Sequence, residues 1–278
     1  MAIDLIEKVL PCVDEVFTTT SKKQIITNND FEWTGAHSIK VYKITTASMN
    51  DYDRNGTGTN ASRYGQVQNL DAATEEFMLS NDRAFTYAID KLDTDETGGT
   101  MAAVSTLSRQ QREVIVPEID SYIYATMCEE AGTKPKAIEL TKENIYSEIV
   151  AANTVLDNNE VPETERFLIV SPEIYLLMKQ SSEITLDTNV GQDIKLNGVI
   201  SNLDGLNVIK VSSMRLPENF GFLIGHKVAT VAPVKLEDYK MHEDPPGING
   251  VLVEGRICYD AFVLDNKKMA LYYQEITA

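Results

Sequence analysis

The sequence predicts an α+β fold, and three patterns carry this prediction. Apolar and polar residues alternate over 38–44 and 77–89, which is typical of strands. Helix formers dominate 97–132, and apolar residues recur at helical spacing over 141–157. These strand and helix patterns do not alternate regularly enough for a parallel βαβ sheet.

Composition excludes several classes of function. The 278 residues are 43% apolar and 24% charged, a globular balance with room for about two domains of ~150 residues. The 25 Lys and Arg against 42 Asp and Glu leave a net charge of −17, which argues against a main role in binding phosphate backbones or anionic membranes. No apolar run approaches the ~18 residues of a membrane span, and charges interrupt the region where a signal peptide would be apolar.

The first 33 residues show no sustained periodicity. After a short apolar stretch that Pro11 interrupts, the chain is polar and extended in character. Such an arm cannot fold alone. We therefore expect it to lie on another surface, such as that of a neighbouring subunit.

A polar segment, 48–71, separates the first two strand patterns and contains Asn55-Gly56, Gly58 and Gly65. Because strand-like stretches flank a tip rich in Gly and Asn, we expect a long hairpin that reaches away from the body. The residues expected to share strand faces on its two sides are Ile39 and Val41, then Phe77, Leu79, Phe85, Tyr87 and Ile89.

The helical stretch from Thr97 to Gly132 predicts a rod ~50 Å long. Pro117 should kink or restart it near the middle, and Gly132 suits the position that ends a helix. A second helix is expected over 141–157, with Thr141 as its N-cap.

A buried strand over 166–170 is followed by Ser171-Pro172-Glu173, which has the residue types of a helix start. Turns and strands are expected over 194–235. The C-terminal region predicts antiparallel strands over 250–264 and 268–276 that turn at Asp265-Asn266.

One motif resembles a metal-binding loop. Asp51, Asp53, Asn55 and Gly56 match the start of an EF-hand calcium loop, but its twelfth position is Ser62, where a bidentate carboxylate is needed. A turn-rich loop tip is therefore favoured, and a calcium-binding protein or enzyme using these residues is kept as an alternative.

No other residues predict chemistry. The histidines His37, His226 and His242 lie in separate segments, and the acidic run Asp90, Asp93, Asp95 and Glu96 suits a solvated connection before a helix. The cysteines Cys12, Cys128 and Cys258 are predicted to be packed apolar residues made in a reducing cytosol. We expect no catalytic site, no metal and no cofactor.

The acidic run ends in Thr97 and is followed by Val116-Pro117-Glu118-Ile119-Asp120-Ser-Tyr122. This order resembles the major capsid proteins of tailed bacteriophages with the HK97-type fold. There, such a run leads from a strand into a long spine helix that carries a Pro-Glu-(Ile/Val)-Asp-x-Tyr element. Val170-Ser171-Pro172-Glu173 likewise resembles the strand-to-helix step of that family's A domain.

The resemblance implies a map of the chain. It comprises an N-terminal arm over 1–33, the first part of a P domain over 34–136 with an extended E-loop over 45–73 and the spine helix over 98–131, an A domain over 137–235, and P-domain return strands over 236–278. The E-loop residues expected to make assembly contacts are Tyr52, Arg54, Arg63 and Tyr64. No lysine lies between Lys43 and Lys91, so we do not expect the E-loop cross-link that some members form.

The function implied is that of a major capsid (head) protein, a structural virion protein and not an enzyme. Hexamers and pentamers of the chain would form an icosahedral shell around double-stranded DNA without sequence-specific binding. The implied partners are scaffolding, portal and decoration proteins, with assembly in the host bacterial cytoplasm and no membrane. An encapsulin-like bacterial nanocompartment shell is the alternative within this fold.

Overall fold

A computed structural model describes residues 21–28, 38–44, 46–56, 62–69, 72–96, 103–186 and 201–277. Some predictions concern residues outside these ranges, namely most of the arm, Cys12, His37, Gly58, 97–102 and 194–200. The chain divides into two compact units. We call Trp33–Leu79 the hairpin unit, and Met1–Glu32 with Ser80–Ala278 the body.

The hairpin unit contains β1 (Ser38–Ile44) and β2 (Ala72–Met78), which pair antiparallel from Ser38 opposite Met78 to Ile44 opposite Ala72. A hairpin is therefore present as expected, but its second strand is not the predicted 77–89. That stretch is divided after Met78, and Phe85, Tyr87 and Ile89 lie in the next strand, Asn81–Asp90, which pairs elsewhere. We call the described loop residues of the hairpin, 46–56 and 62–69, the distal loop.

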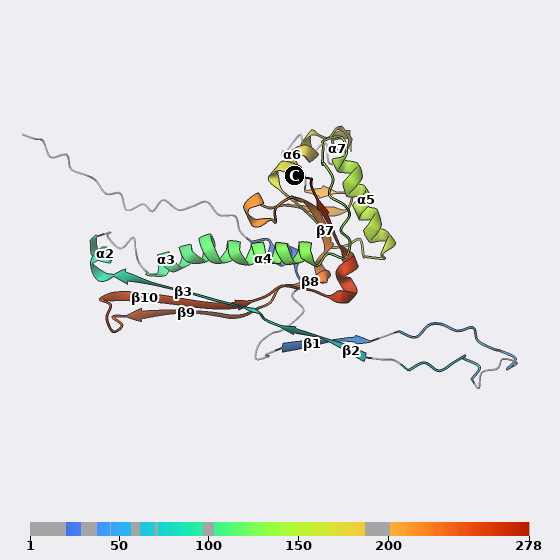
Figure 1. The fold of residues 1–278 in the computed structure, drawn as a ribbon, viewed down its shortest axis with the longest axis horizontal. Coiled ribbons are helices and arrows are strands. Elements are labelled where there is room, and N and C mark those ends of the chain that lie inside the picture. Colours follow the sequence, from blue (N-terminus) through green and yellow to red (C-terminus); the bar gives the residue numbers. More distant parts are fainter. Residues whose placement is uncertain are drawn as a thin grey trace, which may run out of the picture. The chain divides into compact units, whose positions relative to one another are not determined.

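The first half of the body contains a long helix beside a sheet (Figure 1). Its elements are α1 (Lys23–Ile26), β3 (Asn81–Asp90), α2 (Lys91–Glu96), α3 (Ala103–Gln110), a π-helical turn η1 (Gln111–Ile115) and α4 (Val116–Glu129). The helix continues from α3 through η1 into α4. Pro117 has no N–H to donate to the preceding turn, so the helix widens into the π turn just before it. The helix does not restart at Pro117, because its backbone stays helical through the π turn directly before this residue.

The second half of the body contains short helices and strands in irregular order. Its elements are α5 (Ile145–Asn158), β4 (Arg166–Val170), α6 (Pro172–Gln180), α7 (Ser182–Leu186), β5 (Asn202–Leu203), β6 (Leu206–Lys210), η2 (Ser213–Arg215), β7 (Phe220–His226), η3 (Lys227–Ala229), β8 (Thr230–Val231), β9 (Val234–Glu243), β10 (Gly250–Tyr259), β11 (Phe262–Val263), η4 (Asp265–Ala270) and β12 (Leu271–Glu275).

Two larger sheets organise the body. β3, β10 and β9 form an antiparallel sheet in that order, and the Tyr87 hydroxyl on β3 bonds to Thr106 Oγ1 on α3 at 3.1 Å. A five-stranded sheet has the order β12-β7-β4-β6-β5, in which β4 and β6 are its one parallel pair. The class is α+β as predicted, with one parallel crossover that begins at α6.

Strand β4 lies at the centre of the hydrophobic core because all five of its residues are buried. Phe167 and Ile169 pack on one side with Ile123 and Met127 of α4. Leu168 and Val170 face the other side and belong to the cluster that contains the buried residues of α5 and α6. This two-sided burial explains why Phe167–Val170 is an unbroken apolar run that does not alternate.

Ser171 caps α6 as predicted, since its Oγ accepts from the Ile174 N–H at 3.3 Å and Pro172 occupies the first turn. Thr141 does not cap α5. The helix begins four residues later, and Asn144 Oδ1 instead accepts from the Thr141 N–H at 2.7 Å.

The predicted turn at Asp265-Asn266 is wrong. Residues 265–270 form the 3₁₀ helix η4, and β12 pairs with β7 in the five-stranded sheet instead of returning on β10. The predicted return segment 236–278 is thus divided among three sheets, since β11 pairs with β8. Gly132 also has a different role, because α4 ends at Glu129 and the Gly132 N–H donates to the Lys268 carbonyl at 2.9 Å. A Cβ at Gly132 would lie 2.6 Å from that backbone, so glycine permits η4 to approach.

The described part of the predicted arm, 21–28, packs on its own chain. Ile26 is buried in the same core cluster as α4, and the Asn28 N–H donates to the Thr230 carbonyl at 2.8 Å. For these residues, the surface that receives the arm belongs to the same body.

Candidate assembly surfaces

The distal loop is held together by side chains, because the β1–β2 ladder ends at Ile44 and Ala72. Ser48 and Gln68 exchange two hydrogen bonds of 3.1 and 3.3 Å across the loop. Further out, Asn50 Nδ2 donates to the Tyr64 carbonyl at 3.3 Å. These contacts hold the two sides of the loop near each other without a continuous ladder.

Asp53 shapes the tip of the distal loop. Its Oδ1 accepts from the backbone N–H groups of Asn55 at 3.1 Å and Gly56 at 2.8 Å, and Gly56 has φ of +68°. This is the side-chain turn that Asp-x-Asn-Gly sequences favour. Among the described residues, no three acidic, His or Cys side chains lie close enough to hold a metal ion. Asp53 therefore serves the turn that the sequence favoured over calcium.

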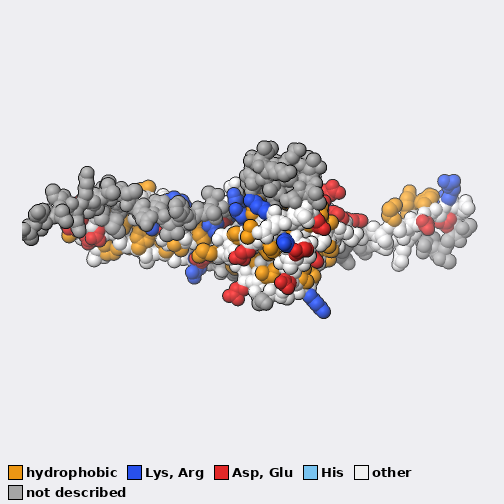
Figure 2. Space-filling view, turned by 90° about the horizontal axis from the view of Figure 1, so that it is seen from above, with side chains coloured by type: hydrophobic (Ala, Val, Ile, Leu, Met, Phe, Trp, Pro, Cys, Tyr) orange, Lys and Arg blue, Asp and Glu red, His pale blue; other side chains and the backbone are white. Residues whose placement is uncertain are grey.

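The four predicted contact residues come together near this tip. The Asp53 N–H donates to the Arg63 carbonyl at 2.9 Å, which places 52–54 beside 63–64. The Tyr52 and Tyr64 rings meet edge to face, with centroids 5.0 Å apart. Figure 2 shows apolar, basic and acidic side chains together at its right-hand end, where the loop between β1 and β2 lies in Figure 1.

These side chains are exposed. Tyr52 is 53% exposed and Tyr64 is 78% exposed, and both arginine side chains face solvent. Arg54 and Arg63 form no ion pair with any residue that the structure describes. Tyrosine and arginine contribute most to protein interfaces when a partner covers them. The arrangement can thus supply two aromatic rings and two exposed guanidinium groups to another surface.

A second feature lies on the long helix, where the side chains of three motif residues bond to five residues from other parts of the chain. Glu118 pairs with Arg83 of β3 at 2.8 Å and accepts from the Tyr259 hydroxyl at 3.1 Å. Burial and then Glu118 raise the pKa of Tyr259 to about 12. The motif that carried the resemblance is therefore a set of tertiary contacts around α4.

Asp120 is the buried member of this motif. It is 3% exposed, its Oδ2 accepts from Arg215 Nη1 at 2.8 Å, and its Oδ1 accepts from the Ser21 hydroxyl at 2.6 Å. Burial raises the pKa of Asp120, while the bonds from Ser21 and Arg215 act in the opposite direction. The pair links α4 to η2 and to the start of the described arm.

The third member, Tyr122, donates its hydroxyl to Asp260 Oδ1 at 2.8 Å. Sequence reasoning missed Arg215 and Asp260. Each lies about 95 residues or more from its partner on α4, and nothing local in the sequence indicates such a pairing.

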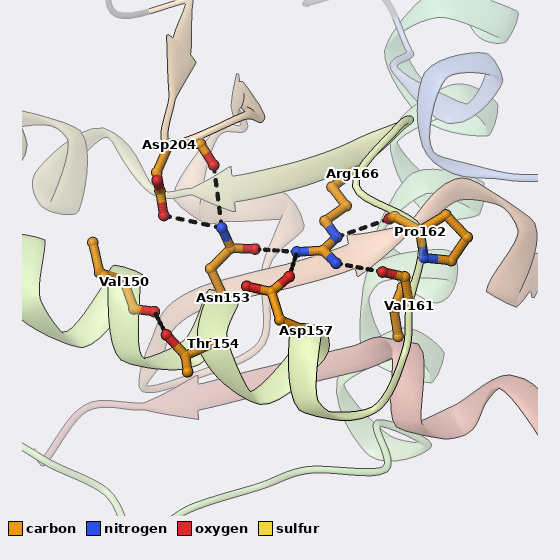
Figure 3. Close-up of polar contacts among 8 residues, drawn as sticks. All are labelled: Val150, Asn153, Thr154, Asp157, Val161, Pro162, Arg166 and Asp204. Carbon is orange, nitrogen blue, oxygen red and sulfur yellow. Dashed lines mark hydrogen bonds and ion pairs between the residues drawn. The ribbon is translucent and has the colours of Figure 1, made fainter.

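In the second half of the body, Arg166 organises a buried network (Figure 3). Its side chain is 2% exposed and donates to the carbonyl oxygens of Val161 and Pro162, to Asn153 Oδ1 and to Asp157 Oδ1. Asn153 Nδ2 in turn donates to Asp204, at 3.1 Å to its carbonyl and 3.0 Å to its carboxylate. One arginine thus fixes α5, the loop before β4 and the β5–β6 turn.

The remaining candidates for chemistry have structural surroundings. Cys128 is buried, and this raises the pKa of its thiol to about 12, so it is packed and unreactive. Burial lowers the pKa of His226, whose Nδ1 accepts from the Val228 N–H at 3.2 Å. His242 lies 3.4 Å from Glu254 on the exposed face of the β9–β10 pair. None of the helices in the described ranges is long and apolar enough to cross a membrane.

No family model and no curated protein matches the chain. Solved structures match it over nearly its whole length at low identity. A structure from Mycobacterium phage Che8 has a TM-score of 0.80 at 15% identity, covering 98% of this chain and 97% of that one. The capsid structure of the cyanophage P-SCSP1u has a TM-score of 0.78 at 16% identity, covering 98% and 93%.

A virus-like particle from Pyrococcus furiosus is a weaker match, with a TM-score of 0.55 at 11% identity and 92% of each chain covered. The stronger matches are both structures from phages. The protein described here therefore has the HK97-type fold of tailed-phage capsid proteins.

Proposed function

We propose that the chain is a major capsid protein, which assembles with copies of itself into the icosahedral shell that encloses phage double-stranded DNA. The observation that carries this proposal is the likeness to the P-SCSP1u capsid structure over 98% of the chain. The shell would be built from hexamers and pentamers. The virion is its location, after assembly in the bacterial cytoplasm with scaffolding, portal and decoration proteins as partners.

The domain map follows with one change. Residues 1–33 act as the arm, 34–136 as the first part of the P domain with the E-loop over 45–73 and the spine helix over 98–131, and 137–235 as the A domain. Of the segment 236–278, β9 and β10 return to the P domain. We assign β12 to the A domain because it pairs with β7.

The E-loop supplies the assembly contacts in this proposal. Its tip has two exposed tyrosines and two arginines without ion partners among the described residues, on a chain of net charge −17. The carboxylates in excess on a second copy of this chain are matching partners for the two arginines. We propose Tyr52, Arg54, Arg63 and Tyr64 as contacts to a neighbouring subunit.

Electron microscopy of the purified chain tests the proposal. We expect closed icosahedral shells, and a chain that stays monomeric at high concentration and moderate salt would contradict it. The contents of the particles distinguish this function from the encapsulin-like alternative. An encapsulin-like shell would enclose a protein cargo, whereas a phage head would enclose DNA. The lower TM-score of the Pyrococcus furiosus particle favours the phage head.

A further inference from the structure

We propose that Asp260 fixes Ser80, the first residue of the body after the hairpin unit, so that β3 stays fixed and the direction of the E-loop changes N-terminal to Ser80. The chain passes between the two compact units twice, between Glu32 and Trp33 and between Leu79 and Ser80. β2 ends at Met78 and pairs with β1, whereas β3 begins at Asn81 and pairs with β10. Neither ladder includes the two residues between them.

The anchor consists of four hydrogen bonds to one carboxylate. Asp260 Oδ2 accepts from the Ser80 backbone N–H at 2.7 Å and from the Ser80 hydroxyl at 2.8 Å. Oδ1 accepts from the Tyr122 hydroxyl and from the Ala261 N–H, each at 2.8 Å. Ser80 is thus held to Asp260 through both its backbone and its side chain, and Asp260 is in turn bonded to Tyr122 of the spine helix.

Asp260 is itself immobilised. It is 4% exposed, and its own N–H donates to the Pro233 carbonyl at 3.2 Å. The preceding Tyr259 pairs with Asn81 across the sheet, so the backbone is fixed directly beside the anchored serine. No lysine or arginine in the described ranges forms an ion pair with Asp260.

This set of donors requires a carboxylate. A carboxylate presents only acceptors, which matches four donors, whereas an asparagine amide would turn N–H groups toward N–H or O–H donors. A role in packing alone would not require a charged group at this buried position. The chemistry therefore identifies Asp260 as a positioning residue for Ser80.

The consequence for assembly rests on the proposed function. Chains in hexamers and pentamers have different neighbours, so the E-loop must take different directions from the same body. With Ser80 fixed, the change is confined to the backbone at Leu79 and before it. The sheet β3-β10-β9 and its contacts to the spine helix then stay the same in every subunit.

Amide hydrogen exchange of the unassembled chain tests the anchor. In the wild type the Ser80 amide should exchange much more slowly than a free amide, although Ser80 itself is exposed. Asp260→Asn should accelerate that exchange about ten- to hundredfold, and Ser80→Ala, which keeps the backbone bond, about two- to tenfold. Asp82→Asn is the matched control, because it removes an exposed ion pair with Arg256 two residues along. This control should leave the Ser80 amide unchanged.

The anchor would be refuted if the Ser80 amide of the wild type exchanged as fast as an unprotected amide. It would also be refuted if this amide exchanged at the same rate in the wild type and in both anchor variants. Ser80→Ala keeps the test open if Asp260→Asn fails to fold. In electron micrographs the anchor variants should give particles of mixed size where the Asp82→Asn control gives one size. Uniform particles from the anchor variants would overturn the role in shell geometry. Absence of shells from the wild type as well would count against the proposed function and leave the exchange result standing.

Discussion

The body and the hairpin unit are stabilised in different ways. In the body, strand β4 is buried on both sides, and buried ionic side chains such as Arg166 and Asp120 have their hydrogen bonds satisfied by several partners. In the hairpin unit, a seven-residue ladder is followed by a loop whose cross-loop bonds are few and exposed. Large apolar side chains on that loop, including Met49 and Val67, face solvent.

The difference indicates where each unit obtains its order. The body buries enough apolar surface to offset the entropy of ordering its chain. The distal loop buries little, yet it displays the residue types that interfaces use. We therefore expect changes in the body to alter folding and changes in the distal loop to alter association.

The largest effect should come from removing the distal loop. Replacing 50–69 with an Asn-Gly turn should abolish closed shells while the monomer still unfolds cooperatively, because shortening a loop changes closure entropy only slightly. Electron microscopy and urea unfolding measure the two outcomes. Shells of normal size would refute the E-loop assignment, and loss of monomer folding would place the segment in the core.

Breaking the buried ion pair should have the largest effect on the body. Arg215→Met leaves Asp120 buried without its cation, which should lower the free energy of unfolding by about 3–5 kcal/mol. The matched control is Arg83→Met, whose partner is also on the spine helix but whose side chain is 66% exposed, so about 0–1 kcal/mol is expected. Equal losses in urea unfolding would mean that burial does not distinguish these pairs.

Single changes at the loop tip should have a moderate effect on association alone. Tyr64→Ala should raise the concentration needed for shell assembly about tenfold or more, as expected for a tyrosine that contributes ≥ ~1.4 kcal/mol at an interface. Tyr64→Phe keeps the ring and should assemble nearly as the wild type. Light scattering against concentration measures this, and unchanged assembly of Tyr64→Ala would remove Tyr64 from the contact.

The smallest effect concerns pH. Burial lowers the pKa of His226 below its ordinary 6.5, so the folded state binds this proton less well than the unfolded state. The stability that neutral His226 contributes is present above about pH 6.5 and is lost as pH falls. The gap in urea midpoint between the wild type and His226→Asn should therefore narrow from pH 7.5 to 5.5. A gap that widens would contradict the assigned direction.

Local patterns predicted most elements because each rests on neighbouring residues. The cap at Ser171 follows from a short polar side chain before a proline, and a local change of the helix near Pro117 follows from the missing N–H, although its form, a π turn, was not predicted. The turn at Asp265-Asn266 failed because its residues suit both a hairpin and a 3₁₀ helix, and tertiary contact with Gly132 decides between them. Asp260 stayed hidden because its partner Ser80 is 180 residues away.

The most direct test of the account is a cryo-electron microscopy reconstruction of particles formed by the purified chain. We expect an icosahedral shell in which the body keeps the same fold in every subunit and the distal loop, with Tyr52 and Tyr64, lies against another copy of the chain. A particle whose distal loops all face solvent, or a chain that forms no shell under any condition that keeps it folded, would contradict the account.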